Sequence, residues 1–387
     1  ISAALAGNPR LVVLDEPTTA LDKTTEAQVL ELVQGLRERF RATLVYVSHD
    51  LNVIAEMCDR VLVMLDGRVV EEGDTAAVYG RPAHDYTRRL IAAVPRVDRD
   101  PGRLAAPSAA EPLLSVRGLG YRYATRRRWP WSRPAGAERD ALSGVSFDIH
   151  PGETLGLVGE SGSGKSTAAA VIAGLLAPTA GEVLFGGLPL PPLAVARSHE
   201  TRRRIQIIFQ DPLSSLNPRQ RIDAILARPL ALFHGLAGAA ARKRAAELLE
   251  SLQLDPAFLD CYPRQLSGGQ QQRVAIARAF AASPDLVICD EITSALDVSV
   301  QAQVLALLKG LQERSGTACL FISHDLGVIG QVAGRVVVLR DGTVREAGRT
   351  QAVFRQPADD YTRLLVEAAS RGYARLPGSP AAMAAVS

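Results

Sequence analysis

The chain has 387 residues, of which 47% are hydrophobic and 22% charged, values ordinary for a folded globular protein that exclude a disordered polymer. Its length suggests two or three domains at roughly 100–200 residues each. With 44 basic and 41 acidic residues the formal net charge is only +3, which gives no support for a dedicated nucleic-acid or anionic-membrane binder.

The cysteines and the apolar runs exclude further classes. Cys58, Cys261, Cys289 and Cys319 form no CxxC pair and have no neighbouring ligand histidine, which fits reduced thiols better than a disulfide framework or a zinc site. No apolar run reaches the roughly 20 residues that span a bilayer, and no secretory signal pattern opens the sequence. Ile1 opens what resembles the middle of a helix, so we expect the chain to begin inside a domain.

The sequence contains an internal repeat. Residues 1–95 match residues 276–370 at a constant offset of 275 positions, for example LVVLDEPTTALD (Leu11–Asp22) with LVICDEITSALD (Leu286–Asp297). The first copy has no counterpart of what precedes Ile276 in the second copy. We therefore expect the C-terminal part of one domain at 1–95, a linker at 96–112, a complete domain at 113–370 and a disordered tail at 371–387.

Apolar runs along the chain predict the strands. The first copy keeps the strands Leu11–Leu14 and Thr43–Val47, and we expect a strand that precedes a phosphate loop to be missing from between them. A helix is expected at Thr167–Leu176. The strands expected in the complete domain are Leu113–Val116, Val145–Ile149, Thr154–Gly159, Ile205–Phe209, Leu286–Cys289, Cys319–Ile322 and Val336–Leu339. Short apolar runs between helical stretches are typical of parallel strands buried on both faces, so an α/β fold follows.

The strongest motif is a GxxxxGK[ST] sequence between a predicted strand and a predicted helix. It consists of Gly159, Glu160, Ser161, Gly162, Ser163, Gly164, Lys165 and Ser166. Glycines at this spacing let successive N–H groups point at phosphate oxygens, at the positive end of the following helix. Lys165 is expected to reach the β- and γ-phosphates and Ser166 to ligate Mg²⁺, with Thr167 beside them in the nucleotide site. A Gly/Ser turn that merely caps a helix is the competing interpretation.

A second signal is the predicted strand Leu286–Cys289, followed by the carboxylates Asp290 and Glu291. Asp290 at the strand end is expected near the metal, and Glu291 can polarise a water for attack on the γ-phosphate. A strand that ends in solvated acids is the alternative. The position of this segment after the phosphate loop, and its repetition at Leu11–Glu16, favour the functional interpretation.

Ser267, Gly268, Gly269 and Gln270, followed by QQRVAIARA, resemble the signature motif of ABC-type ATPases. Glycines at a helix start provide the same phosphate-facing device as the P-loop, and in this family the motif serves the nucleotide of the opposite domain. The resemblance implies a P-loop NTPase of the ABC type, with a mixed α/β sheet core and a helical subdomain, preceded by the C-terminal part of a second copy.

Other residues match the family by position. The resemblance implies that Gln210 contacts Mg²⁺ and the attacking water, that Asp297 belongs to the D-loop and that His324 contacts the γ-phosphate. Tyr123 is placed like the aromatic residue that stacks on adenine. Tyr121 competes with it, and strand packing is the alternative for either.

The first copy carries few of these residues. Those that the resemblance assigns to it are Asp15, Glu16, Asp22 and His49, without a P-loop, Q-loop or signature. In the second copy Ile292 stands where the family usually has a proline, as at Pro17. We expect this replacement to alter the backbone between Glu291 and the D-loop.

Two segments are similar to the peptide/nickel importer branch of the family. FQDPLSSLNPR (Phe209–Arg219) resembles its Q-loop region, and residues 81–87 and 356–362 resemble its C-terminal P-x-H-P-Y-T element. Asp85 and Asp360 replace the second proline of that element, and Asp359 replaces the histidine; an ordinary amphipathic helix is the alternative. The basic, Trp-containing insertion at 124–140 is interpreted as a surface loop near the cytoplasmic face, with nucleic-acid binding as the alternative.

The resemblance implies a fused double ATPase at the cytoplasmic face of the inner membrane. It would use ATP and Mg²⁺ to energise an importer of di- or oligopeptides or a related solute such as glutathione or nickel. The implied partners are transmembrane permease subunits, a periplasmic or extracellular solute-binding protein and a second ABC domain, but no nucleic acid.

Two other classes compete with this interpretation. A soluble twin-ABC ATPase of translation or DNA repair would, in its translation form, need a charged helical linker and NHLD in place of Thr19–Asp22. A non-catalytic regulatory ATP-binding module is disfavoured by Glu291 and His324.

Overall fold

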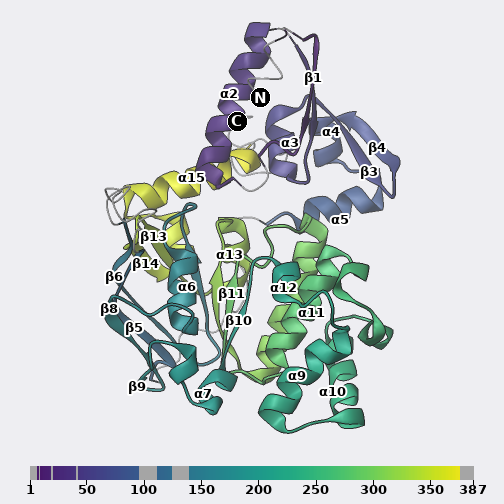
Figure 1. The fold of residues 1–387 in the computed structure, drawn as a ribbon. Helices are drawn as coiled ribbons and strands as arrows, with labels where there is room; N and C mark the ends of the chain where they lie inside the picture. The colour runs from purple at the N-terminus through teal and green to yellow at the C-terminus, as the bar shows by residue number, and fades with distance from the viewer. Residues whose placement is uncertain are drawn as a thin grey trace, which may run out of the picture.

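The computed structural model describes residue 7 and residues 9–18, 21–40, 42–95, 111–123 and 139–374. Nearly all of the expected linker at 96–112 and of the insertion at 124–140, and residues 375–387 of the expected tail, lie outside this range. Figure 1 shows the first copy at the top and the complete domain below it.

The described part of the first copy forms two separate two-stranded sheets with helices beside them. Strands β1 and β2 pair in parallel, and β3 and β4 pair antiparallel. The elements are β1 (Leu11–Asp15), α2 (Lys23–Phe40), β2 (Thr43–Val47), α3 (Leu51–Met57), β3 (Arg60–Leu65), β4 (Arg68–Asp74), α4 (Thr75–Gly80) and α5 (Asp85–Ala93).

The complete domain contains two sheets and a helical part. The larger sheet has the order β10-β11-β12-β7-β13-β14, parallel except for the β13–β14 hairpin, and the smaller antiparallel sheet has the order β6-β5-β8-β9. The elements are β5 (Leu114–Tyr123), β6 (Arg139–Ile149), β7 (Thr154–Val158), α6 (Lys165–Ala173), β8 (Ala180–Phe185), β9 (Leu188–Pro189), η1 (Ala194–Ala196), α7 (His199–Arg204), β10 (Ile205–Ile208), α8 (Pro212–Ser215), α9 (Ile222–His234), α10 (Gly238–Ser251), η2 (Pro256–Asp260), η3 (Pro263–Gln265), α11 (Gly268–Phe280), β11 (Leu286–Asp290), α12 (Val298–Ser315), β12 (Ala318–Ile322), α13 (Leu326–Val332), β13 (Arg335–Arg340), β14 (Thr343–Arg349), α14 (Thr350–Arg355) and α15 (Asp360–Ala374). Helix α15 runs past residue 370, the expected end of the domain.

The large sheet is buried on both faces. In β11, Val287 and Cys289 face the core beneath the helical part, whereas Leu286 and Ile288 join the core between the two sheets. Successive side chains of a strand point to opposite faces. Because both faces are covered, the strand is a continuous apolar run rather than an alternating one.

The position of the P-loop strand corrects one expectation. Strand β7 pairs with β12 on one side and with β13 on the other, and the repeat makes β2 and β3 the counterparts of these strands. The expectation that this strand is missing from between Leu11–Leu14 and Thr43–Val47 is therefore wrong, because β1 pairs directly with β2 just as β11 pairs with β12. The described part of the first copy has no counterpart of β7, so its four strands fall into two sheets.

Without that strand and the elements around it, the first copy exposes one apolar face. Its exposed large side chains, each between 46% and 61% exposed, are Leu11, Val13, Val45, Val47, Leu62, Met64 and Val69. Most of their counterparts in the complete domain, such as Leu286 and Ile322, are fully buried between the two sheets. The first copy therefore has apolar residues at the positions that form the core between the two sheets of the complete domain, but in the first copy these residues are exposed.

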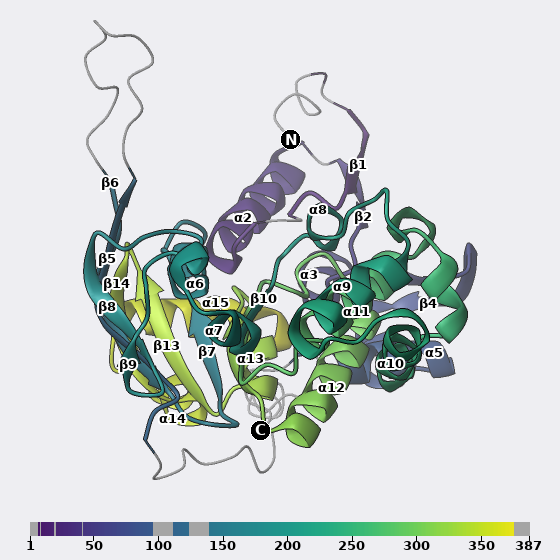
Figure 2. The ribbon, with the colours of Figure 1, turned by 60° about the horizontal axis from the view of Figure 1, so that its bottom comes forward.

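The two copies nevertheless contact each other. Helix α15 packs against α2 and α3, and α5 packs against α12 (Figure 1). At the start of α13 the carbonyl of Pro95 approaches Gly327 so closely that a Cβ on Gly327 would lie 2.8 Å from its oxygen. A second view (Figure 2) places α2 between the sheet-rich part of the complete domain, near α6, and its helical part, with β1 and β2 above the helical part.

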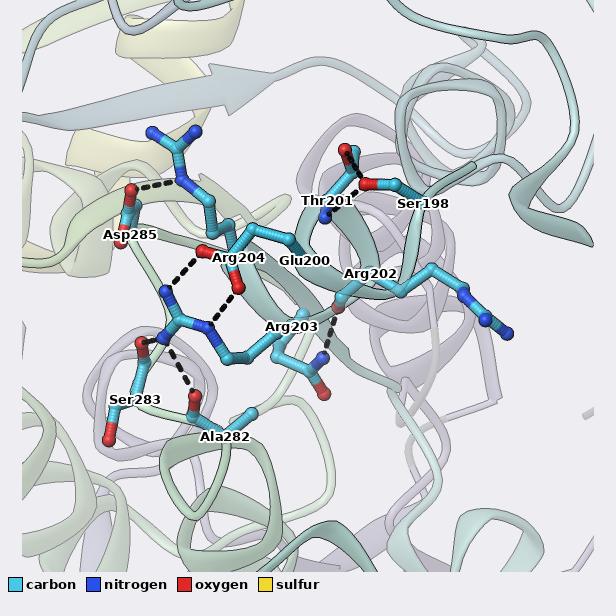
Figure 3. A network of polar contacts seen from close by, with 10 residues as sticks. Ser198, Glu200, Thr201, Arg202, Arg203, Arg204, Ala282, Ser283 and Asp285 are labelled. Carbon is cyan, nitrogen blue, oxygen red and sulfur yellow. Dashed lines mark hydrogen bonds and ion pairs between the residues drawn. The ribbon is translucent and has the colours of Figure 1, made fainter. Parts of the chain in front are cut away.

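A polar network fixes β10 beside β11 (Figure 3). Arg203 on α7 donates to both carboxylate oxygens of Glu200, at 2.7 and 2.9 Å, and to the carbonyl of Ser283, at 2.8 Å. Arg204 donates to Asp285 at 2.6 Å. These contacts join the start of β10 to the connection between α11 and β11. Because β10 and β11 pair in parallel, the residues that follow the two strands lie at the same sheet edge.

Two further features bear on the expected class. Among the described residues, no single helix has the length and hydropathy of a membrane span; α9 and α10 pass such a test only when taken together, and they are bent by 111°. Cys289 and Cys319 are distant in the sequence, but they lie on neighbouring strands with their Sγ atoms 3.6 Å apart as buried free thiols.

Candidate functional site: the P-loop pocket

The GxxxxGK[ST] motif forms a loop between β7 and the N-terminus of α6, as the sequence predicts. Two of its glycines are required by the backbone. Gly159 has φ 149°, and a Cβ there would lie 2.2 Å from the carbonyl oxygen of Leu339. Gly164 caps α6 at φ 105°, where an added Cβ would lie 2.5 Å from the carbonyl oxygen of Ala141. Only glycine fits these positions, so the loop can curl around an anion at the helix N-terminus.

Lys165 lies beneath this loop and is 4% exposed. Its Nζ donates to the carbonyls of Gly159 and Glu160, at 2.7 and 2.8 Å. Burial lowers the pKa of Lys165, and the nearby carboxylates of Glu291 and Asp290 partly offset that effect. The ammonium group is therefore held at the floor of a site suited to phosphate oxygens.

Ser166 and Asp290 are the residues suited to hold a metal. The Ser166 hydroxyl donates to Oδ1 of Asp290 at 3.0 Å. Burial raises the pKa of the Asp290 carboxyl, and the neighbouring Glu291 adds to this effect, so a cation here would relieve an unfavourable negative charge. Among the described residues no group of three or more His, Cys, Asp or Glu side chains could hold a metal alone. A hydroxyl and a carboxylate fit Mg²⁺, which takes one or two carboxylates, substrate phosphates and waters.

Glu291 is the meeting point of the polar side chains. Gln210 Nε2 donates to Oε2 of Glu291 at 3.0 Å, and Nδ1 of His324 lies 3.4 Å from the same oxygen. Although burial opposes it, the contact with His324 and the charge of Lys165 hold the pKa of Glu291 below its ordinary value. The carboxylate is therefore charged and fixed from two sides. The structure thus brings together the three residues that the sequence assigned to the Q-loop, the strand end and the switch histidine.

Glu291 also has an unusual backbone conformation. Its φ is 47°, a left-handed value that costs free energy in a non-glycine residue and that clusters at functional sites. Glu16 in the first copy has φ 44°, with Pro17 after it, whereas Ile292 follows Glu291 and is buried. The expected change of backbone caused by Ile292 is not seen at the glutamate, because the two copies share the same left-handed conformation.

Tyr123 lies at the other end of the site. The residue is 48% exposed, and its hydroxyl lies 3.2 Å from the Thr167 hydroxyl. Tyr121 instead packs against the core between the sheets, with its ring plane 80° from that of Tyr123 and the ring centroids 4.9 Å apart. Of the two candidates, Tyr123 lines the pocket described next and Tyr121 does not.

One pocket of about 700 Å³ lies among these residues, although Asp290 and Tyr121 do not line it. Its lining residues are Leu21, Asp22, Tyr123, Ala141, Ser161, Gly162, Gly164, Lys165, Ser166, Thr167, Gln210, Asp211, Pro212, Glu291, Ser294, Ala295 and His324. Gly159, Glu160 and Ser163 belong to the same loop but do not line the pocket, and Ser163 is buried. A volume of this size fits a nucleotide-sized ligand.

Part of the pocket wall comes from the first copy, through Leu21 and Asp22, which the sequence did not predict. Asp22 caps α2 by accepting from the Thr25 N–H at 2.9 Å, and it also accepts from the backbone N–H of Ser161 in the P-loop. Although partial burial opposes it, these hydrogen bonds lower the pKa of Asp22. The repeat identified Asp22 as a D-loop residue, but it did not indicate that Asp22 lies against the P-loop of the other copy.

Two predicted parts of the site lie away from the pocket. Asp297, the counterpart of Asp22, caps α12 through the Val300 N–H at 2.9 Å and does not line the pocket. The signature residues begin α11, where Ser267 and Gln270 form a capping box. They do not line the pocket either, and their action on the nucleotide of an opposite domain stays a prediction.

The loop, the buried lysine and the fixed carboxylate define a P-loop nucleotide-binding domain. Residues 142–294 match the family described as "ABC transporter", and residues 70–129 match the "Oligopeptide/dipeptide transporter, C-terminal region". The chain belongs to the ABC transporter ATPase family, in the branch that includes peptide and glutathione importers. The resemblance seen in the sequence is thereby confirmed, and so is the α/β fold class.

Proteins of known name support this family membership. The glutathione import ATP-binding protein GsiA of Salmonella typhi is 42% identical over 391 residues, and that of Escherichia coli is 41% identical over 390. Each match covers 95% of this chain but 62% of the relative, so the chain spans less than two thirds of these proteins.

Among solved structures, the dimeric ATP-binding cassette MJ0796 bound to ADP and Pi is 33% identical, with a TM-score of 0.54 over 61% of this chain and 98% of that one. CbiO1 of Clostridium perfringens, described as part of an ABC transporter complex, is 28% identical with the same TM-score, over 64% of this chain and 92% of that one.

Proposed function

We propose that the chain binds and hydrolyses ATP and energises the import of a solute. The observation that carries this proposal is the convergence of Lys165, Gln210, Glu291 and His324 on one pocket at the P-loop. Family membership supports the same activity. The catalytic residues proposed are Glu291, His324 and Lys165.

In the proposed mechanism, Lys165 and the N–H groups of the P-loop bind the phosphates, and Tyr123 stacks on the adenine. Glu291, charged and held by Gln210, orients or deprotonates the water that attacks the γ-phosphate. His324 stabilises the γ-phosphate end. Such a reaction depends on positioning and on neutralising charge more than on covalent chemistry.

We propose Ser166, Asp290 and Gln210 as the residues that face Mg²⁺, on the basis of the oxygen donors of the first two and the buried charge of Asp290. When bound with ATP, Mg²⁺ neutralises charge on the β- and γ-phosphates.

The domain organisation supports a site shared between domains. We propose that 1–95 and 113–370 are two ABC units joined by a linker at 96–112, and that the P-loop of the second unit pairs with a signature from an opposing domain. Ser267, Gly268, Gly269 and Gln270 would in turn serve another P-loop. The position of Asp22 beside Ser161 supports this face of the complete domain as the one that meets its partner.

For the transported solute we propose di- or oligopeptides or a related compound such as glutathione or nickel. The support is the match of residues 70–129 and the names of the relatives. The chain would then work at the cytoplasmic face of the membrane, with separate permease subunits and a solute-binding protein. Copurification with membranes that contain the permease would support this assignment, whereas copurification with ribosomes would favour a translation ATPase.

Nucleotide titration tests the core of the proposal. The full chain should bind MgATP, and Lys165→Ala should abolish binding because it removes the buried ammonium group. Lys243→Ala, on the exposed surface of α10, is the matched control and should bind normally. Absence of binding by the wild-type chain, or equal binding by Lys165→Ala, would contradict the proposal.

A further inference from the structure

One peptide group of the P-loop is held from both sides. Its carbonyl, that of Gly159, accepts from Lys165 Nζ at 2.7 Å, and its N–H, that of Glu160, donates to the hydroxyl oxygen of Tyr361 at 3.0 Å. Because the peptide unit is planar, these two contacts fix the orientation of the whole group. Tyr361 lies at the start of α15, 201 residues further along the chain.

The tyrosine is itself held in place. It is 4% exposed, and the guanidinium carbon of Arg340 lies 4.6 Å from its ring centroid. The turn before α15 is fixed by Glu346 on β14, which accepts from the N–H groups of Ala358 and Asp359 at 3.0 and 3.2 Å. Asp359 then accepts from the Tyr361 N–H at 2.9 Å. The hydroxyl is therefore presented to the P-loop by a rigid segment.

The hydroxyl group of Tyr361 is protonated at neutral pH. Burial, with a further contribution from the Glu160 carboxylate, raises the pKa of Tyr361 to about 12. A neutral hydroxyl oxygen accepts a hydrogen bond from the Glu160 N–H at every pH at which the protein is handled.

The repeat provides an internal comparison. Tyr86 has the same place at the start of α5, after a turn in which Glu71 accepts from the N–H groups of Ala83 and His84 at 2.7 and 3.0 Å. Tyr86 packs against the apolar cluster around Ile54, and the sequence of the first copy contains no P-loop. The local architecture is therefore common to both copies, whereas the contact with a phosphate loop belongs to Tyr361.

We propose that Tyr361 is a positioning residue of the nucleotide site: its hydroxyl fixes the Gly159–Glu160 peptide and, through it, the resting position of Lys165. This inference rests on the proposed nucleotide binding. A loop ordered in advance loses less conformational freedom when the ligand binds, so removal of the hydroxyl should weaken ATP binding rather than slow the chemical step. Because α15 also packs against α2 and α3, the same contact joins the P-loop to the first copy.

Hydrogen exchange in the nucleotide-free full chain tests the contact itself. Tyr361→Phe keeps the ring and removes the acceptor, so exchange in peptides covering 159–165 should become several-fold faster because the Glu160 N–H loses its partner. The matched variant Tyr86→Phe should leave exchange in these peptides unchanged. Equal exchange rates for wild type and Tyr361→Phe would overturn the proposal.

Nucleotide affinity tests the consequence. Loss of one neutral hydrogen bond predicts that the Kd for MgATP rises roughly threefold to tenfold in Tyr361→Phe, while kcat at saturating ATP and the thermal midpoint stay close to wild type. An unchanged Kd, or a fall in kcat and thermal midpoint without a change in Kd, would overturn the positioning role. If the wild-type chain bound no ATP, the proposed function would fail, and the exchange experiment would still decide whether Tyr361 orders the loop.

Discussion

The imidazole Nδ1 of His324 lies 3.4 Å from Oε2 of Glu291, and the first copy repeats the pair as His49 and Glu16, 2.9 Å apart. The pairs differ in their surroundings. Glu291 is 16% exposed and faces a P-loop, whereas Glu16 is 43% exposed in a copy whose sequence contains none. The same glutamate–histidine pair therefore occurs twice in the chain, once beside a P-loop and once in a copy whose sequence has no P-loop.

This relationship gives the first prediction a built-in control. Glu291→Gln should leave MgATP binding intact and lower ATP turnover at least about 100-fold, a typical loss for a positioned acid or base. Glu16→Gln removes the corresponding carboxylate from the first copy and should leave turnover unchanged. Steady-state hydrolysis and nucleotide titration of both variants make the comparison, and near-normal turnover by Glu291→Gln would refute the assignment.

A second prediction concerns the contact between the copies. Lys23 donates to Asp50 at 2.6 Å and to Glu26 at 2.7 Å, with 22% of its side chain exposed, and Asp325 of the complete domain adds to its electrostatic stabilisation. Lys23→Met should lower the free energy of unfolding by roughly 2 kcal/mol, because it leaves a largely buried carboxylate without its partner. The exposed pair Arg37–Asp59 offers the control, since Arg37→Met should cost about 0.5 kcal/mol or less.

The pH dependence of this effect follows from Asp50. Although burial opposes it, the charge and hydrogen bond of Lys23 hold the pKa of Asp50 below its ordinary value. A depressed pKa in the folded state contributes stability above the unfolded-state value of about 4, and that contribution is lost as the pH falls through the folded-state value. The difference in urea midpoint between wild type and Lys23→Met should therefore be full at pH 7 and shrink in acid. A difference that grew on acidification would contradict this account.

The exposed apolar face of the first copy leads to a third prediction. Strands β1 to β4 present side chains that are buried in the complete domain, and flat apolar sheet faces and edges are liable to aggregation and local opening. Limited proteolysis should degrade residues 1–95 first and leave a resistant core near Leu113–Ala369. Mass spectrometry of the fragments measures this, and equal protection of both segments would show that the face is covered.

The sequence predicted seven strands of the complete domain and helix α6, but not β8, β9, β14 or the bounds of the other helices, and β5 and β6 are longer than predicted. The predicted strand Leu286–Cys289 is β11 extended by one residue, because a strand buried on both faces is a continuous apolar run. The helix predicted at Thr167–Leu176 begins two residues earlier and ends at Ala173, since Gly174 caps it at φ 77°. The P-loop, Gln210, Glu291 and His324 meet as predicted because each begins within two residues of the end of a strand of the same sheet.

What the sequence could not provide depends on packing between distant segments. The order of strands in a parallel sheet is not the order along the chain, so β7 was placed beside the wrong neighbours. The repeat marks Asp22 and Asp297 as equivalent, yet only the contact between the copies places Asp22 at the P-loop. The hydrogen bond between Tyr361 and Glu160 spans 201 residues and no motif announces it.

The central claim is that the P-loop pocket is a nucleotide site completed by the signature of an opposing domain. The chain's own signature, Ser267–Gln270, does not line the pocket, and the sequence of the first copy contains none. ATP turnover per mole of chain, measured over a wide series of protein concentrations, tests this claim most directly. We expect low turnover per mole in dilute solution and a rise in turnover per mole with protein concentration, because two complete domains must pair head to tail. A high turnover per mole that does not depend on concentration, from a proven monomer, would contradict this claim.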